Sequence, residues 1–216
     1  MDKLRDIIDN SMDLWKGYLT HPFILGLADG SLSEEKFVNY LIEDTIYLRE
    51  YARVYAMAMY KSHSLRDIRE YYSVLSFVNE SESSERRVWL NERGFTDGQI
   101  DQMEPKKANA EYFGFMLDMA EKYEAPEILM AVLPCMFSYA YIFRHVAENC
   151  DIGGSRYRGF ILGYASEDYY KNCLRWYEFA EEKCRDIEGE RLERLKGIFR
   201  RSSEYEKAFW DMAFEG

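Results

Sequence analysis

The sequence contains few histidines, prolines and cysteines, and these shortages exclude several classes of protein. Only three histidines, four prolines and four cysteines occur among its 216 residues. No Gly/Ser-rich or single-residue tract indicates a linker or a disordered arm. There is also no P-loop, no GxGxxG motif and no Ser-His-Asp arrangement. The common motifs of nucleotide-binding proteins and serine hydrolases are therefore missing.

The three histidines, His21, His63 and His145, do not form a metal-binding pattern. A carboxylate-bridged di-metal bundle usually supplies Glu-x-x-His motifs on its helices. Here the residue three positions before each histidine is a tyrosine or an isoleucine. We therefore expect no metal and no di-iron oxygenase. His21 as a haem ligand is an alternative, although an HPF segment at a helix end is more typical of a cap or a packing element.

The four cysteines are widely spaced and form no CxxC pair. The first residues, MDKLRDIIDNSMDLW, are charged and amphipathic, unlike a signal peptide. These two features predict reduced thiols in a cytoplasmic protein rather than a disulfide framework. Three of the thiols, those of Cys150, Cys173 and Cys184, are expected to be buried small hydrophobes.

Positive charge and long apolar runs are also scarce. The formal net charge is −11, which argues against nucleic-acid binding because that affinity comes largely from Lys and Arg on phosphates. No apolar run approaches the ~20 residues needed to cross a bilayer, so no membrane partner is expected. The expected partner is a small molecule or a second copy of the chain.

What the sequence does contain is the composition of a folded globule. Hydrophobic residues make up 47% and aromatic residues 16%, with 18 tyrosines. A chain of this length can bury a sizeable core, and we expect one domain over residues 1–216.

Helical periodicity extends over nearly the whole sequence, and no segment alternates with period two for long enough to predict a strand. The segment 126–149 is apolar on nearly every side, so it is either a membrane span or the buried centre of a bundle; its polar ends favour the centre.

The stretch 21–33 is interpreted as a loop. The fold class is therefore all-α, with seven or eight helices expected at about 2–18, 34–62, 64–94, a short helix after a Thr96–Gln99 capping box, 107–123, 126–149, 156–185 and 189–214.

Two carboxylates interrupt apolar helical stripes. Asp44 falls among Phe37, Tyr40, Leu41, Tyr47, Leu48 and Tyr51, and Glu206 falls among Phe199, Ser202, Phe209 and Trp210. A carboxylate on an apolar stripe loses hydration and needs partners, or its pKa rises. A structural Asp bonded to a buried tyrosine or to backbone would explain Asp44 equally well. Two inward carboxylates on different helices nevertheless suggest a site.

The third candidate is Cys135, which follows Pro134 inside the apolar run AVLPCMFSYAYI. A proline inside a helix removes one backbone donor and clashes with the preceding turn, which predicts a kink that opens room beside the thiol. A buried cysteine is more often inert than reactive, and a reactive one needs a nearby group to take its proton. Asp44 or Glu206 are the candidates for that group.

Tyrosines that face inward occur on other predicted helices. Each one alone is interpreted as a core aromatic whose hydroxyl has found a partner; together they could form the walls of a site for a flat aromatic ligand. On the predicted 107–123 helix, Tyr112 shares a face with Phe115, Met116 and Met119. On the predicted 156–185 helix, Tyr164 shares a face with Tyr157, Phe160, Ile161 and Asp168. Tyr47 and Tyr139 complete the set.

Four motifs in the right order resemble the TenA family, the thiaminase II or aminopyrimidine aminohydrolase proteins. HPFILGLADGSLSEEKFVNYLIEDTIYL matches the family's first signature, with Glu43 standing where many members have Gln. LPC…Y (Leu133 to Tyr139) resembles the nucleophile segment. YASEDY (Tyr164 to Tyr169) and E..FW (Glu206 to Trp210) resemble the later motifs.

The resemblance implies a haem-oxygenase-like helical bundle without haem, assembled as a homotetramer. It implies hydrolysis of 4-amino-5-aminomethyl-2-methylpyrimidine to the 5-hydroxymethyl compound and ammonia in thiamin salvage, with cleavage of thiamin as a second activity and no metal or organic cofactor. By matching motifs, Cys135 is the nucleophile, Glu206 the general acid/base and Asp44 the carboxylate that holds the pyrimidine; Glu204 is the fallback for Glu206. The residues that line or order the pocket are Tyr47, Tyr112, Tyr139, Tyr164 and Phe209.

Two other classes of function remain open at this point. A non-catalytic pyrimidine- or thiamin-binding protein would use the same pocket but would leave the thiol beside two carboxylates without a purpose. A haem-handling protein on the same bundle is the other alternative, and a haem titration without a Soret shift would exclude it.

Overall fold

The computed structural model describes residues 2–80 and 82–216, and the side chains of these residues except 76–85. Twelve helices and no strand occur in these ranges, which confirms the all-α prediction, although seven or eight helices was too low a count. The helices are α1 (Lys3–Asp9), α2 (Met12–Tyr18), α3 (Pro22–Asp29), α4 (Glu34–Lys61), α5 (Leu65–Glu80), α6 (Glu82–Asn91), α7 (Asp97–Ile100), α8 (Lys107–Lys122), α9 (Ala125–Asn149), α10 (Arg158–Ala165), α11 (Glu167–Cys184) and α12 (Gly189–Glu215).

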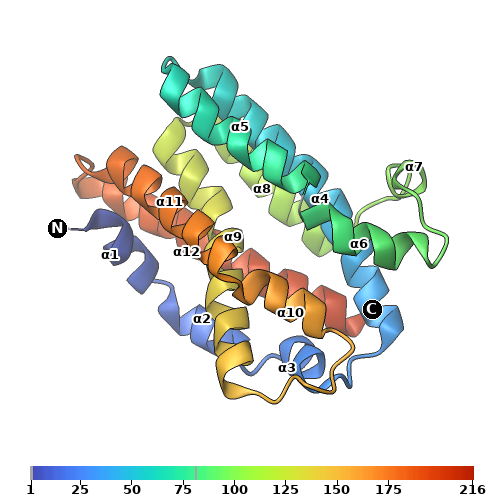
Figure 1. The fold of residues 1–216 in the computed structure, drawn as a ribbon. Helices are drawn as coiled ribbons and strands as arrows, with labels where there is room; N and C mark the ends of the chain where they lie inside the picture. The colour runs from blue at the N-terminus through green and yellow to red at the C-terminus, as the bar shows by residue number, and fades with distance from the viewer. Residues whose placement is uncertain (1, 81) are drawn as a thin grey trace.

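Helix α9 lies at the centre of the bundle and packs against α4, α8, α10, α11 and α12 (Figure 1). Its most apolar 18-residue window is 89% buried, as predicted for the segment 126–149. By length and composition α9 could nevertheless cross a membrane, the one such helix in the described ranges. The expectation that no segment approaches that length was therefore wrong. The surrounding helices account for its apolar composition.

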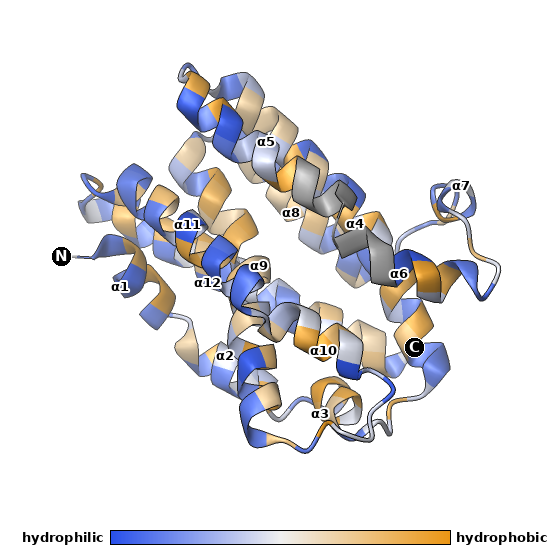
Figure 2. Ribbon diagram, viewed as in Figure 1, coloured by the Kyte–Doolittle hydropathy of each residue, from blue (hydrophilic) through white to orange (hydrophobic). Residues whose placement is uncertain are grey.

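The other helices bury one face and expose the other. Hydrophilic (blue) and hydrophobic (orange) residues are interspersed along most of them in Figure 2, as expected for amphipathic helices around a common core. The buried apolar side chains form one cluster to which every one of the twelve helices contributes. Burial of this cluster supplies the main stabilising free energy of the fold.

Helices α9 and α12 run side by side in the same direction and are joined at two levels. Near their starts, the buried Glu127 accepts hydrogen bonds from Arg191 Nε at 2.8 Å, Arg191 Nη2 at 2.9 Å and Arg194 Nη2 at 3.2 Å. Farther along both helices, Ser202 Oγ donates to the Ala131 carbonyl at 2.7 Å. The ion pairs and the hydrogen bond fix the axial position of one helix against the other.

The N-terminal region contains three helices where the sequence analysis expected one helix and a loop. The predicted helix from Asp2 to Tyr18 is divided at Asn10–Ser11 into α1 and α2, residues that favour turns. The stretch interpreted as a loop contains α3, which has Pro22 at its start and Gly30 in the left-handed region (φ 78°) after its end. Proline at the first position and glycine just past the last are helix-boundary signals, and the loop interpretation overlooked them.

The predicted helix over 156–185 is also two helices, α10 and α11. Ser166 stands between them with an extended backbone (ψ 151°), and its Oγ accepts a hydrogen bond from Tyr169 N at 3.2 Å, capping α11. The break changes the helical register, so Asp168 does not share the face of Tyr164. The Asp168 side chain is 97% exposed, which corrects the predicted alignment.

The helix predicted from Ser64 to Gly94 covers α5 and α6, and residue 81 between them lies outside the described residues. Its predicted ends are confirmed: Ser64 Oγ accepts from Asp67 N at 3.5 Å, and Gly94 is left-handed (φ 82°). The capping box of Thr96 and Gln99 is also present.

Pro134 lies inside α9, and the helix continues through it to Asn149. Because proline has no N–H, the Met130 carbonyl loses its helical donor. Carbonyls on both sides of the proline accept side-chain hydroxyls from other helices: Val132 from Tyr51 at 3.4 Å and Met136 from Tyr169 at 3.2 Å. These bonds anchor the segment around Cys135 to α4 and α11.

Candidate active site

Asp44, Cys135 and Glu206 meet in the interior from α4, α9 and α12. The Cys135 thiol is hydrogen-bonded to Glu206, and the charge of Asp44 acts on the same carboxyl. Asp44 and Glu206 are buried, as their places in apolar stripes predicted, and Cys135 is partly exposed. The structure therefore brings together the three residues that sequence analysis selected.

Glu206 is held by Tyr112, whose hydroxyl donates to Glu206 Oε1 at 2.5 Å. Burial, reinforced by the charge of Asp44, raises the pKa of Glu206 to about 7, while the hydrogen bonds from Tyr112 and Cys135 oppose that rise. A carboxyl group with a pKa near neutrality can both accept and donate a proton at physiological pH.

Asp44 has a partner that the sequence analysis missed. Arg86 of α6 places Nη2 2.5 Å from Asp44 Oδ2, and both side chains are buried. Burial raises the pKa of Asp44, and the adjacent guanidinium opposes that rise. The sequence carries only weak evidence for this ion pair, because Arg86 is followed by a second arginine, Arg87. Nothing in the local pattern shows which of the two side chains turns inward.

Replacing Arg86 with methionine is expected to destabilise the fold by about 3 kcal/mol, because it leaves Asp44 as an unpaired buried charge. Denaturant unfolding at neutral pH would measure the loss. The matched control is Arg87→Met, since Arg87 is exposed and should change stability by less than about 0.5 kcal/mol. The double variant Asp44→Asn/Arg86→Met should recover part of the loss. Equal stabilities for the Arg86 and Arg87 variants would contradict this account.

The aromatic residues selected from the sequence gather around the three polar groups. Tyr47 lies between Tyr112 and Phe209, with ring centroids 5.0 and 6.0 Å away. Tyr139 packs against Tyr164 at 4.9 Å. A Cys135 thiolate would act electrostatically on the hydroxyls of Tyr47, Tyr112 and Tyr139, and burial raises the pKa of all three. The three tyrosine side chains are therefore neutral, and each hydroxyl can both donate and accept a hydrogen bond.

Tyr40 was assigned to the stripe of Asp44 but not to the site. Its hydroxyl lies 2.9 Å from the Tyr139 hydroxyl, and the charge of Asp44 acts on it. The i, i+4 spacing of Tyr40 and Asp44 on one helix was the signal that could have identified it.

Glu43, beside Asp44 in the sequence, serves a neighbouring helix instead. Its carboxylate accepts hydrogen bonds from Lys106 N at 3.1 Å and from Asn109 Nδ2 at 2.7 Å. Lys106 precedes the first residue of α8, so Glu43 satisfies a free backbone donor at that helix start. A carboxylate is well suited to this position because it only accepts hydrogen bonds.

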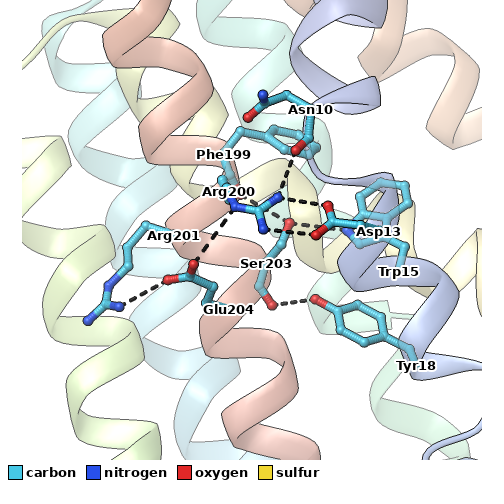
Figure 3. A network of polar contacts seen from close by, with 9 residues as sticks. All are labelled: Asn10, Asp13, Trp15, Tyr18, Phe199, Arg200, Arg201, Ser203 and Glu204. Carbon is cyan, nitrogen blue, oxygen red and sulfur yellow. Dashed lines mark hydrogen bonds and ion pairs between the residues drawn. The ribbon is translucent and has the colours of Figure 1, made fainter.

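Glu204, the fallback for Glu206, lies on the outer side of α12. It pairs with Arg201 at 3.0 Å and with Arg200 at 4.0 Å (Figure 3). Its side chain is 41% exposed. The α12 carboxylate that faces Cys135 is thus Glu206.

His21, Cys173 and Cys184 lie in structural positions. His21 Nδ1 accepts a hydrogen bond from Phe23 N at 3.2 Å, capping α3, and its Nε2 lies 3.0 Å from Asp211 Oδ1. Cys173 and Cys184 are buried, and burial raises the pKa of each thiol to about 12. Cys150 is only partly buried, which departs from the prediction. No group of three or more His, Cys, Asp or Glu residues arranged for a metal ion occurs in the described ranges.

The centre of this all-helical bundle therefore contains a thiol and two carboxyl groups, with several buried tyrosines around them. The TENA/THI-4/PQQC family model matches residues 8–216, and the chain belongs to this family. The four motifs singled out in the sequence lie within that match.

Relatives and solved structures agree with this membership. The chain is 29% identical over 211 residues to an aminopyrimidine aminohydrolase of Helicobacter pylori, with 97% of each chain covered. It is 25% identical over 209 residues to an aminopyrimidine aminohydrolase of Halalkalibacterium halodurans, covering 96% of this chain and 93% of that protein.

Among solved structures, a TenA homologue from P. horikoshii OT3 superposes with a TM-score of 0.88 at 28% identity over 100% of this chain and 99% of the other. A domain with a heme oxygenase-like fold from Shewanella denitrificans matches with a TM-score of 0.72 at 13% identity, covering 98% and 92% of the two chains. The haem-oxygenase-like fold is therefore confirmed.

Proposed function

We propose that this protein hydrolyses 4-amino-5-aminomethyl-2-methylpyrimidine to the 5-hydroxymethyl compound and ammonia, a reaction of thiamin salvage. The observation that carries the proposal is the convergence of the Cys135 thiol, Glu206 and Asp44 from three helices. The names of the two bacterial relatives, both aminopyrimidine aminohydrolases, support the same reaction.

The first chemical step is addition of Cys135 to a carbon of the pyrimidine ring. Glu206, hydrogen-bonded to the thiol, takes the thiol proton and passes it to a ring nitrogen. A carbon–sulfur bond forms as the electron pair of the ring double bond moves onto that nitrogen, so aromaticity is lost. The pKa of Glu206 near 7 matches a group that must first accept and then donate a proton.

The second step is loss of the amine from the exocyclic methylene. The ring nitrogen gives its proton back to Glu206 and returns its electron pair to the ring system, and the amine, already protonated by solvent, departs as ammonia. Water then adds to the methylene and releases one proton to solvent, while Glu206 protonates the ring nitrogen again. Loss of that proton to Glu206 expels the Cys135 thiolate and restores the aromatic ring, and Glu206 then returns the proton to the sulfur. The net reaction exchanges an amine for a hydroxyl group, with no oxidation or reduction.

Asp44 accepts a hydrogen bond from the ring amino group in this proposal, and Arg86 keeps the carboxylate ionised for that task. Tyr47, Tyr112, Tyr139, Tyr164 and Phe209 supply flat walls for the ring. Exclusion of water by these side chains strengthens the charged contacts, because the effective dielectric constant falls.

Several further features belong to the same proposal. The chain forms one domain, acts in the cytoplasm as a homotetramer and uses neither a metal nor an organic cofactor. Thiamin is a second substrate, cleaved to pyrimidine and thiazole by the same displacement at the methylene, since the thiazolium is also a good leaving group.

The test is to incubate the purified full chain with the aminomethylpyrimidine and, separately, with thiamin. Ammonia and the hydroxymethylpyrimidine should appear in the first reaction and the free thiazole in the second. A parallel titration with haem should give no Soret shift. Tight binding of the aminomethylpyrimidine without ammonia release would support a binding protein and contradict the proposed hydrolysis.

A further inference from the structure

Ser202 lies one helical turn before Glu206 on α12 and is fully buried. Its Oγ donates a hydrogen bond to the Ala131 carbonyl at 2.7 Å and lies 3.2 Å from the Tyr112 hydroxyl. A carbonyl oxygen can only accept, so the single hydrogen of Ser202 is committed to Ala131. Towards Tyr112, Ser202 is therefore an acceptor.

The Tyr112 hydroxyl has one hydrogen and two oxygen neighbours, Glu206 Oε1 at 2.5 Å and Ser202 Oγ at 3.2 Å. An ionised carboxylate only accepts hydrogen bonds, so the tyrosine hydrogen points at Glu206 when Glu206 is charged. Cys135 is the second donor to the same carboxylate. In this state both donors are satisfied.

When Glu206 takes up a proton, it becomes a donor as well, and one of its two neighbours must become an acceptor. Sulfur is a weak acceptor and a phenol oxygen a better one. Tyr112 can accept only if its own hydrogen finds another acceptor, because leaving a buried hydroxyl hydrogen unpaired is unfavourable. Ser202 Oγ is placed to receive it.

We infer that Ser202 is a positioning residue which accepts the Tyr112 hydrogen when Glu206 is protonated beside the neutral Cys135 thiol, so that one tyrosine serves both protonation states of the carboxyl. The hydrogen bonds then run from Glu206 through Tyr112 and Ser202 to the Ala131 carbonyl on α9. The inference on protonation rests on hydrogen-bond geometry alone; its consequence for turnover rests on the proposed function.

The other groups that act on Glu206 come from four helices. They are Tyr18 of α2, Asp44 and Tyr47 of α4, Tyr112 of α8, and Cys135 and Tyr139 of α9. Arg86 of α6 reaches the site through Asp44. Of these groups, only Tyr112 lies within hydrogen-bonding distance of Ser202, whose other partner is the Ala131 carbonyl on α9.

Ser203 provides a matched control on the same helix. It is equally buried and makes two hydrogen bonds, accepting from Trp15 Nε1 at 3.1 Å and donating to the Phe199 carbonyl at 3.0 Å. These contacts lie in the network of Figure 3, on the side of α12 that faces α2. Ser203→Ala thus removes a comparable buried hydroxyl without touching Tyr112.

The experiment is a carboxyl carbon NMR titration of the full chain labelled at glutamate, with the Glu206 signal assigned from Glu206→Gln. Removing the acceptor in Ser202→Ala disfavours the protonated carboxyl, so the pKa of Glu206 should fall by about one pH unit, a tenfold change in its proton affinity. Ser202→Cys, which keeps a weaker acceptor, should give a smaller fall, and Ser203→Ala none. An unchanged or raised pKa in both Ser202 variants would overturn the inference.

The same variants separate this inference from the proposed function. If the chain hydrolyses the aminomethylpyrimidine, the acidic limb of its kcat/KM profile should move to lower pH in Ser202→Ala by the same interval as the NMR titration. If the wild-type chain releases no ammonia, the proposed function fails while the NMR titration still decides the role of Ser202.

Discussion

Cys135→Ser is expected to lower kcat for the aminomethylpyrimidine by more than about 10⁴-fold, because a positioned acid/base step alone contributes about 10²–10⁴ and this change removes the nucleophile itself. A serine hydroxyl at the same place holds its proton far more tightly than a thiol, so Glu206 cannot generate an effective nucleophile from it. Substrate affinity should be retained, since Asp44 and the tyrosines are unchanged. Single-turnover ammonia release and equilibrium binding would measure the two effects separately.

Cys150→Ser is the matched control for this change. Cys150 follows the last residue of α9 and is partly exposed, far along the helix from the site. Its replacement should leave kcat within about twofold, because surface substitutions away from special features have small effects. Near-normal hydrolysis by Cys135→Ser would exclude thiol addition as the mechanism.

Glu206→Gln is expected to lower kcat/KM by about 10²–10⁴-fold, the usual contribution of a general acid/base. In the wild type, the Cys135–Glu206 pair must hold one proton in total, so that one proton can move from sulfur to the ring nitrogen. Below the Glu206 pKa of about 7 the pair gains a second proton, and kcat/KM should fall about tenfold per pH unit. A pH-rate profile should therefore show an acidic limb near pH 7, and this limb should be absent in Glu206→Gln.

The same carboxyl group predicts a change of stability with pH. The folded-state pKa of Glu206 is raised from 4.5 to about 7, so the folded chain binds the proton more tightly than the unfolded chain. Tighter proton binding at Glu206 stabilises the folded state by about 3 kcal/mol. This stabilisation is fully present below pH 4.5 and is lost as the pH rises to 7. Denaturant unfolding of the wild type and Glu206→Gln at both pH values would measure this, since other groups cancel in the difference. An equal pH dependence for the two chains would show that Glu206 titrates normally.

The sequence was sufficient to identify the carboxylates because burial leaves a periodic signal. Asp44 and Glu206 each occupy a position where helical spacing demands an apolar residue, and the structure buries both. The central position of α9 followed from the same reasoning, since a helix that is apolar all round must be covered. The family motifs then pointed independently to these residues.

The helix ends and the partner of Asp44 could not be predicted in the same way. The breaks at Asn10–Ser11 and Ser166 depend on side-chain caps that compete only weakly with helix continuation, so periodicity carries across them. Arg86 meets Asp44 through a tertiary contact between α6 and α4. Its neighbour Arg87 has the same chemistry, and only the register of α6 in three dimensions distinguishes the two.

The parallel clamp between α9 and α12 has a consequence for substrate choice. The ion pairs of Glu127 with Arg191 and Arg194, and the hydrogen bond of Ser202 to Ala131, hold α9 and α12 together at successive levels. Cys135 of α9 and Glu206 of α12 follow one turn after the second level. The spacing between sulfur and carboxyl is thereby built into helical backbone rather than into a closing loop. A substrate of the proposed reaction must therefore fit a sulfur–carboxyl spacing that the two helices set in advance.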